Sequence, residues 1–223
     1  MTKCFATPLL AASLLLSGCA STLVEPTQYS GFLQDYSRLS EQTSPSGVKV
    51  ARWVDPNLDI SRYTQVYIEP SQFHPRPQPN SRIPQATLND VTSYYDQALR
   101  RELSKVISIA DSPSSSALVI RPAITAVSAE TEGLQPYEVI PIALVLAAAT
   151  TAAGQRDQQV EIATEASFVD GGSSKVVAEV VRKGAGTNLE NSKQVLSAND
   201  VKPVIDGWAS DMRLSLEQLR AKR

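Results

Sequence analysis

Cysteine and histidine are scarce in this chain of 223 residues, which has two cysteines, Cys4 and Cys19, and one histidine, His74. Both cysteines lie in the first nineteen residues, so the rest of the chain has no thiol for a disulfide, a nucleophile or a thiolate metal site. One histidine cannot supply the usual triads or zinc sites, and no Gly-x-Ser-x-Gly, His-Glu-x-x-His or phosphate-loop motif occurs. We expect His74 to be a solvated residue of a proline-rich loop. The sequence predicts neither enzymatic activity nor a metal or other cofactor.

Charge is also limited, because only 20% of the residues are charged and the formal net charge is −2. This balance favours neither nucleic acid nor anionic lipid as a partner. The acidic side chains fall mostly on the polar faces of expected strands and helices, where we expect solvent; they include Glu130, Glu132, Glu161 and Glu165. Gly184-Ala185-Gly186 lacks the third glycine and the helix of a dinucleotide site, which indicates a plain loop.

The most specific motif stands at the start of the chain. Lys3 precedes a short apolar core that ends in Leu16-Ser17-Gly18-Cys19, the pattern at which bacterial lipoproteins are cleaved and acylated. The sequence therefore predicts cleavage between Gly18 and Cys19 and lipidation of Cys19, for example with palmitate, which holds a protein on a bilayer. Ala20 follows where an aspartate would resemble an inner-membrane retention signal. We expect an outer-membrane lipoprotein whose body faces the periplasm.

Removal of residues 1–18 as a signal peptide would leave 205 residues with a formal net charge of −3, since Lys3 is lost. This length fits a single domain. Residues 19–30 are polar and predict a tether that could reach roughly 35 Å at about 3.3 Å per residue. Residues 31–223 would then form one periplasmic domain that begins with an N-terminal strap.

The hydrophobic pattern predicts strands over residues 48–54, 63–68, 117–127, 160–169 and 175–182, with a hairpin turn at 170–173. Pro122 favours an edge strand or a bulge. Helical spacing covers residues 87–107, where Thr87 and Asp90 resemble a capping box.

A second helix is predicted after Asn199 or Asp200, either of which could cap it. Its apolar positions form one stripe that should face the core: Val201, Ile205, Trp208, Met212, Leu216 and Leu219. The predicted fold class is α+β, a mixed or antiparallel sheet with two main helices on one face and an apolar insert between strands.

The insert is an uncharged run of fifteen residues, 139–153. As a helix it would be about 22 Å long, short of the roughly 30 Å hydrocarbon core, yet it is apolar on every face and should be buried. Burial in the protein's own core, contact with a partner or second copy, and contact with a membrane all stay open. Small residues four apart would let another backbone approach closely. The possible partner contacts are Leu144, Leu146, Ala148 and Ala152.

Several motifs in one order resemble the lipoproteins of domain-of-unknown-function family 3313. They are Gly31-Phe32-Leu33, Asp35-Tyr36-Ser37, Trp53-Val54-Asp55-Pro56, Tyr67-Ile68-Glu69-Pro70, Pro136-Tyr137-Glu138-Val139-Ile140-Pro141, Gly154-Gln155-Arg156-Asp157 and Asp206-Gly207-Trp208. The likeness covers nearly the whole chain after the signal. It implies an envelope lipoprotein of unassigned role, and it carries over no catalytic residue and no ligand.

These features together predict a non-enzymatic envelope binding or assembly module, held on the membrane through Cys19, whose partner is an envelope protein or a second copy. An alternative is an oligomeric export or pore component in which the apolar insert contacts the membrane. A third possibility is a carboxylate-dependent hydrolase of envelope glycans that uses Glu161 or Glu165, although no motif supports it.

Overall fold

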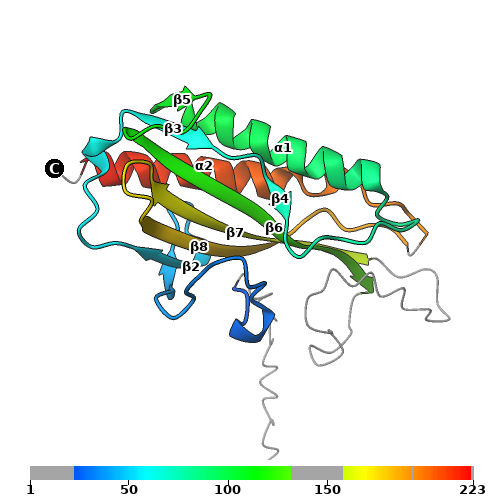
Figure 1. Ribbon diagram of the computed structural model, residues 1–223. Coiled ribbons are helices and arrows are strands. Elements are labelled where there is room, and N and C mark those ends of the chain that lie inside the picture. Colours follow the sequence, from blue (N-terminus) through cyan, green and yellow to red (C-terminus); the bar gives the residue numbers. More distant parts are fainter. Residues whose placement is uncertain (1–22, 132–157, 192, 222–223) are drawn as a thin grey trace, which may run out of the picture.

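The computed structural model describes residues 23–131, 158–191 and 193–221 (Figure 1). These residues form one mixed sheet with the strand order β1-β2-β8-β7-β6-β3-β5, and β4 pairs with β6 beside β3. The strands are β1 (Ser40–Thr43), β2 (Lys49–Val54), β3 (Gln65–Ile68), β4 (Gln72–Phe73), β5 (Ser108–Ala110), β6 (Ala117–Thr131), β7 (Gln158–Asp170) and β8 (Val176–Ala185). Pairing is antiparallel from β1 through β6 and parallel where β3, β4 and β5 join, which confirms the predicted α+β class with a mixed sheet.

Two helices, α1 (Gln85–Leu103) and α2 (Lys202–Ala221), cover one face of the sheet, as Figure 1 shows. The core between them and the sheet is continuous and includes Val91, Leu99 and Ile205, all less than 1% exposed. The predicted stripe on α2 does face this core: Val201, Ile205, Trp208 and Leu216 are buried, and Met212 and Leu219 pack against them.

The starts of both helices differ from the prediction. Thr87 lies inside α1, which begins after Pro84 without a side-chain cap, and its hydroxyl donates to the carbonyl of Leu196 instead. Before α2, Ser197 forms a capping box with Asp200 on the short 3-10 helix Ala198–Asp200, so neither Asn199 nor Asp200 is the cap. A tertiary contact therefore occupies the predicted cap of α1, whereas a local capping box occupies Asp200 before α2.

Pro122 was expected on an edge strand or at a bulge, but it lies inside β6, which has a neighbour on each side. On the parallel side, pairing with β3 ends at Ile120 and pairing with β4 starts at Ala123. Pro122 thus falls in the gap between two partners, where the missing N–H of proline interrupts no pairing with either strand.

The predicted hairpin turn at 170–173 joins β7 to β8. Asp170 organises it, because its Oδ1 accepts the backbone N–H groups of Gly172 and Ser173, while its Oδ2 accepts the Tyr63 hydroxyl at 2.9 Å. A Cβ at Gly171 would stand 2.1 Å from the Ser114 carbonyl oxygen, so only glycine fits there. The turn is therefore fixed against the segment that precedes β6.

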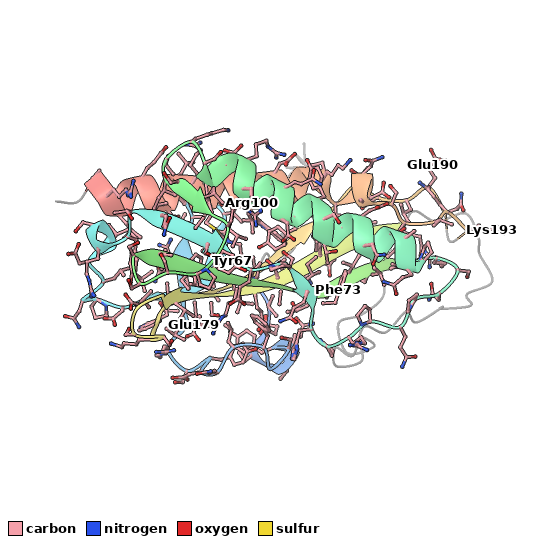
Figure 2. The ribbon with its side chains drawn as sticks, turned by 45° about the horizontal axis from the view of Figure 1, so that its top comes forward. Tyr67, Phe73, Arg100, Glu179, Glu190 and Lys193 are labelled. Carbon is pink, nitrogen blue, oxygen red and sulfur yellow. The ribbon has the colours of Figure 1, made fainter. Side chains whose placement is uncertain are left out.

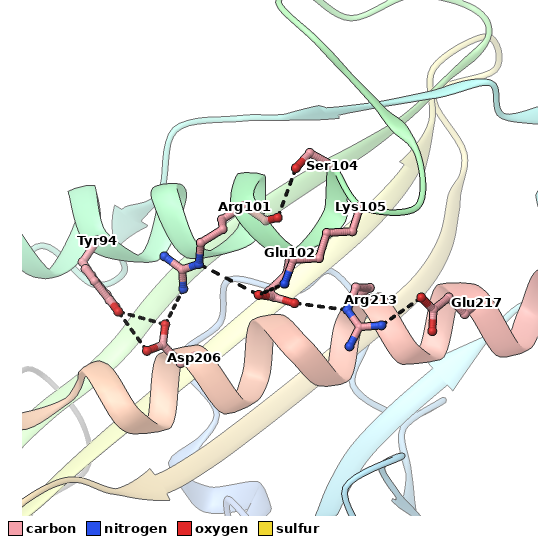
Figure 3. A network of polar contacts seen from close by, with 8 residues as sticks. All are labelled: Tyr94, Arg101, Glu102, Ser104, Lys105, Asp206, Arg213 and Glu217. Carbon is pink, nitrogen blue, oxygen red and sulfur yellow. Dashed lines mark hydrogen bonds and ion pairs between the residues drawn. The ribbon is translucent and has the colours of Figure 1, made fainter.

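Polar contacts join the two helices along their outer side (Figure 3). The Tyr94 hydroxyl of α1 donates to Asp206 of α2 at 2.9 Å, and Arg101 pairs with the same carboxylate at 2.5 Å. About two turns further along α2, Arg213 pairs with Glu102 of α1 at 3.1 Å. These contacts set the register of one helix against the other, although exposed pairs of this kind stabilise a fold by only about 0–1 kcal/mol each.

Candidate functional site

The sheet face opposite the helices is covered by residues 23–39, which we call the strap (Figure 1). Val24 and Leu33 of the strap are 6% and 5% exposed, and they pack with Ala163 and Val181 of the sheet. The sequence assigned residues 19–30 to a tether. That assignment is wrong for residues 23–30, because packing against the sheet is already established at Val24.

Glu165 of β7 fixes the first part of the strap. It is 1% exposed, and its two oxygens accept the Ser30 backbone N–H at 2.9 Å and the Tyr36 hydroxyl at 2.5 Å. The Tyr36 oxygen in turn accepts the backbone N–H groups of Gly31 and Leu33. Burial, and then the hydrogen bond to Glu165, raises the pKa of Tyr36 to about 12. One buried carboxylate thus closes a loop of the strap onto the sheet.

Glu179 of β8 fixes the second part. Its Oε2 pairs with the Arg38 guanidinium at 2.7 Å, and that guanidinium lies 3.9 Å from the centre of the Trp53 ring. The Glu179 side chain has no exposed surface. Burial raises the pKa of Glu179 above its ordinary value, against the opposing effect of Arg38.

The expectation that the strand carboxylates face solvent is therefore wrong for Glu165. Glu161, four residues before Glu165 on the same face of β7, is a third exposed and pairs with Lys183 at 2.8 Å. The side chains of Glu130 and Glu132 lie outside the described residues. The alternation of side chains along β7 places Glu161 and Glu165 on the face away from the helices. It gives no information about a strap that covers that face. Glu165, one of the two carboxylates considered for a hydrolase, instead has both oxygens hydrogen-bonded to the strap.

His74 is half-buried rather than fully solvated. Its ring lies 5.6 Å from that of Phe32 in the strap, and its backbone N–H donates to the Ile124 carbonyl. The described residues include no group of three or more His, Cys, Asp or Glu side chains that could hold a metal ion.

Gly184 and Ala185 were expected in a loop, but they are the last two residues of β8. A Cβ at Gly184 would stand 2.6 Å from Val204 of α2. Glycine is needed at this position because the helix approaches the strand closely.

The remaining sequence-predicted residues lie outside the described residues: Gly18, Cys19, Leu144, Leu146, Ala148 and Ala152. The structure does define where the insert is attached. Pairing of β6 with β7 continues to Thr131 opposite Gln158, so the segment between them starts and ends on adjacent strands. Gln158 is held further by a two-way backbone bridge to Leu189. In the described part of the chain, no helix has the length and apolar character needed to cross a bilayer.

The body is α+β, with the strap on one face of the sheet and two helices on the other. In the sequence, the lipoprotein motif Leu16-Ser17-Gly18-Cys19 precedes the strap. This combination defines a lipoprotein with an α+β body. The chain matches the family model "Protein of unknown function (DUF3313)" over residues 28–212, and it belongs to this family, as the sequence motifs predicted. The uncharacterized lipoprotein YdcL of Escherichia coli strain K12 is 37% identical over 198 residues, which cover 89% of each chain. The YdcL of E. coli O157:H7 matches equally well.

Two solved structures are similar at lower levels. The PelC dodecamer from Paraburkholderia phytofirmans has a TM-score of 0.38 and 15% identity, covering 73% of this chain and 96% of that one. The putative neuraminyllactose-binding hemagglutinin homolog from Helicobacter pylori has a TM-score of 0.37 and 14% identity, covering 72% and 84%. Likeness at this level carries no argument about function.

Proposed function

We propose that the protein is a non-enzymatic lipoprotein of the outer membrane, lipidated on Cys19, whose periplasmic body binds an envelope protein or a second copy of itself. The lipoprotein motif at residues 16–19 and the similarity to an uncharacterized lipoprotein of the same family support a lipid anchor on Cys19. The absence of nucleophile and triad motifs from the sequence supports a binding role.

The strap determines how far the body would stand from the membrane. Five residues after Cys19 the chain reaches Val24, which is packed on the sheet. At most about 3.6 Å per residue, this stretch spans no more than about 18 Å, half the reach that a tether to residue 30 would allow. Val24 and the strap residues beside it would therefore stay within about 18 Å of the anchored Cys19.

The observation that carries the partner contact is the attachment of the insert. The insert connects β6 to β7 at the end of their pairing where Thr131 lies opposite Gln158. The described residues form core clusters of their own on both faces of the sheet. Since the described residues form these clusters among themselves, we infer that the uncharged segment 139–153 contacts another molecule. We place the contact at Leu144, Leu146, Ala148 and Ala152.

A photo-crosslinking residue at Leu144 of the lipidated protein in living cells tests this contact. We expect capture of an envelope protein or of a second copy. Lipid adducts, or uncrosslinked monomer alone, would contradict it.

A pair of aspartate substitutions separates a lost contact from a lost fold. Ala148→Asp should abolish the crosslink from Leu144 without changing the melting temperature. Val195→Asp, at an exposed apolar position elsewhere on the body, is the matched control and should change neither. Unfolding of the Ala148→Asp variant would show instead that the insert belongs to the protein's own core.

A further inference from the structure

A cavity of about 80 Å³ lies between α2 and the sheet. Its floor includes a row of directly paired residues that crosses four strands: Ile120 on β6, Phe168 on β7, Ala178 on β8 and Val54 on β2. Phe168 and Ala178 are only partly buried, although their strands have a neighbour on each side. A helix is about 10–12 Å wide and strands stand about 4.8 Å apart, so two helices leave part of this sheet uncovered.

One face of α2 forms the opposite wall of the cavity. Its lining residues recur at helical spacing: Met212, Ser215, Leu216 and Leu219. The wall and the floor are apolar apart from four residues: Arg52, Glu179, Arg182 and Ser215. A water-sized group needs about 10–15 Å³, and a methylene is about as large as a water, so the cavity has room for an alkyl chain of roughly five to eight carbons.

Two guanidinium groups beside the cavity share one carboxylate. Arg182 pairs with Asp211 of α2 at 3.1 Å, and both residues are buried. Asp211 also accepts the backbone N–H and the hydroxyl of Ser46, each at 3.0 Å. One carboxylate compensates one guanidinium, so a net positive charge remains.

Arg52 is the arginine without a carboxylate of its own. It is partly buried, and among the described residues it forms no ion pair. Its guanidinium donates to two neutral oxygens, Oε1 of Gln42 at 2.7 Å and Oγ of Ser215 at 3.4 Å. The hydrogen bonds to these oxygens use three of its five N–H groups. Burial, and then the charge of Arg182, lowers the pKa of Arg52, so its charged form is destabilised where it stands.

Glu179 does not supply the missing negative charge, although it borders the cavity. Its carboxylate lies on the other face of the sheet, where it pairs with Arg38 of the strap at 2.7 Å (Figure 2). An anionic group that enters the cavity would therefore meet a guanidinium that still has N–H groups to donate.

An apolar cavity beside an arginine without a counter-ion suits a ligand with an alkyl chain and one anionic group. Burial of the chain removes apolar surface from water, and a carboxylate accepts charge-assisted hydrogen bonds from a guanidinium. We propose that this cavity binds a medium-chain aliphatic carboxylate, with its alkyl chain under α2 and its carboxylate paired with Arg52. The site uses no residue of the insert, so it goes beyond the proposed partner contact.

Met212 provides a probe inside the cavity. The only other methionine is Met1, in the predicted signal peptide, so a 13C-methyl-methionine label gives one NMR signal from the mature protein. The lipidated protein in phosphatidylcholine nanodiscs is titrated with hexanoate, hexanol and hexylammonium at neutral pH. We expect hexanoate to shift the signal saturably, with a Kd at least tenfold lower than that of either comparison compound. No shift with hexanoate, or equal Kd values for hexanoate and hexanol, would overturn the proposal.

Three variants locate the ligand. Arg52→Gln should raise the Kd of hexanoate at least tenfold and leave that of hexanol unchanged. Ala178→Leu should fill part of the cavity and weaken the binding of both at least tenfold. Arg121→Gln is the matched control, because it removes a guanidinium that pairs with Glu69 outside the lining, and it should change neither Kd. Hexanoate binding that Arg52→Gln leaves unchanged would refute the ion pair, and binding that survives Ala178→Leu would refute the cavity.

Discussion

Replacing Glu165 with alanine should release the strap while the helices and sheet stay folded. The substitution removes an acceptor from the Ser30 N–H and from the Tyr36 hydroxyl. A hydrogen bond to a charged group contributes about 1.5–3 kcal/mol, and part of the loss is recovered when the freed donors bind water, so we expect strap docking to weaken by about 2–4 kcal/mol. The helix-face core contains no residue of the strap and should be unaffected.

Native-state hydrogen exchange is the direct assay for this effect. The amides of Gly31 and Leu33 donate to the Tyr36 oxygen, so they report whether the loop held by Glu165 is closed. At 1.36 kcal/mol per tenfold change, the expected loss corresponds to exchange roughly 30- to 900-fold faster.

The matched control for that experiment is Glu161→Ala. Glu161 stands on the same face of β7, but it pairs with Lys183, whose side chain is 23% exposed, and no hydrogen bond to a described strap residue is present. We expect an effect below about 1 kcal/mol and unchanged exchange of both strap amides. Equal exchange in Glu165→Ala and the wild type would refute the claim that this carboxylate holds the strap.

Four further substitutions, two of them tested against pH, examine the rest of the structure. Gly171→Ala, whose Cβ would meet the Ser114 carbonyl, should destabilise the protein by about 1–3 kcal/mol in urea denaturation, whereas Gly207→Ala, on an open position of α2, should stabilise it by about 0.5–1 kcal/mol. Hydrogen bonds from Ser173 lower the pKa of Asp170 from 3.8 to about 2, so its contribution to stability should be full above pH 3.8 and fall towards pH 2. In urea denaturation, Asp170→Asn should flatten that fall between pH 3.8 and 2. The pKa of Tyr36 is raised from 10.0 to about 12, so the contribution of its hydroxyl to strap docking should be complete below pH 10 and lost by pH 12. If the strap is released at alkaline pH to the same extent in Tyr36→Phe, this prediction is contradicted.

Local pattern was enough to predict the class of the fold, because alternation and helical spacing both depend on a single buried face. The α2 stripe from Val201 to Leu219 shows this best, since every predicted position packs against the core. The helix caps were harder to predict, because a side chain such as Thr87 is free to bind a distant carbonyl in place of its own helix. The spacing of residues in the sequence does not show whether a side chain binds its own helix or a distant carbonyl.

The strap shows why the covered face of the sheet could not be predicted. Its contacts to Glu165 and Glu179 connect residues more than 120 positions apart in the chain. A short segment with two buried apolar side chains, Val24 and Leu33, has too few of them to show a period. The available signal was the pair of carboxylates themselves: acidic residues on the outer face of central strands need partners if anything covers them.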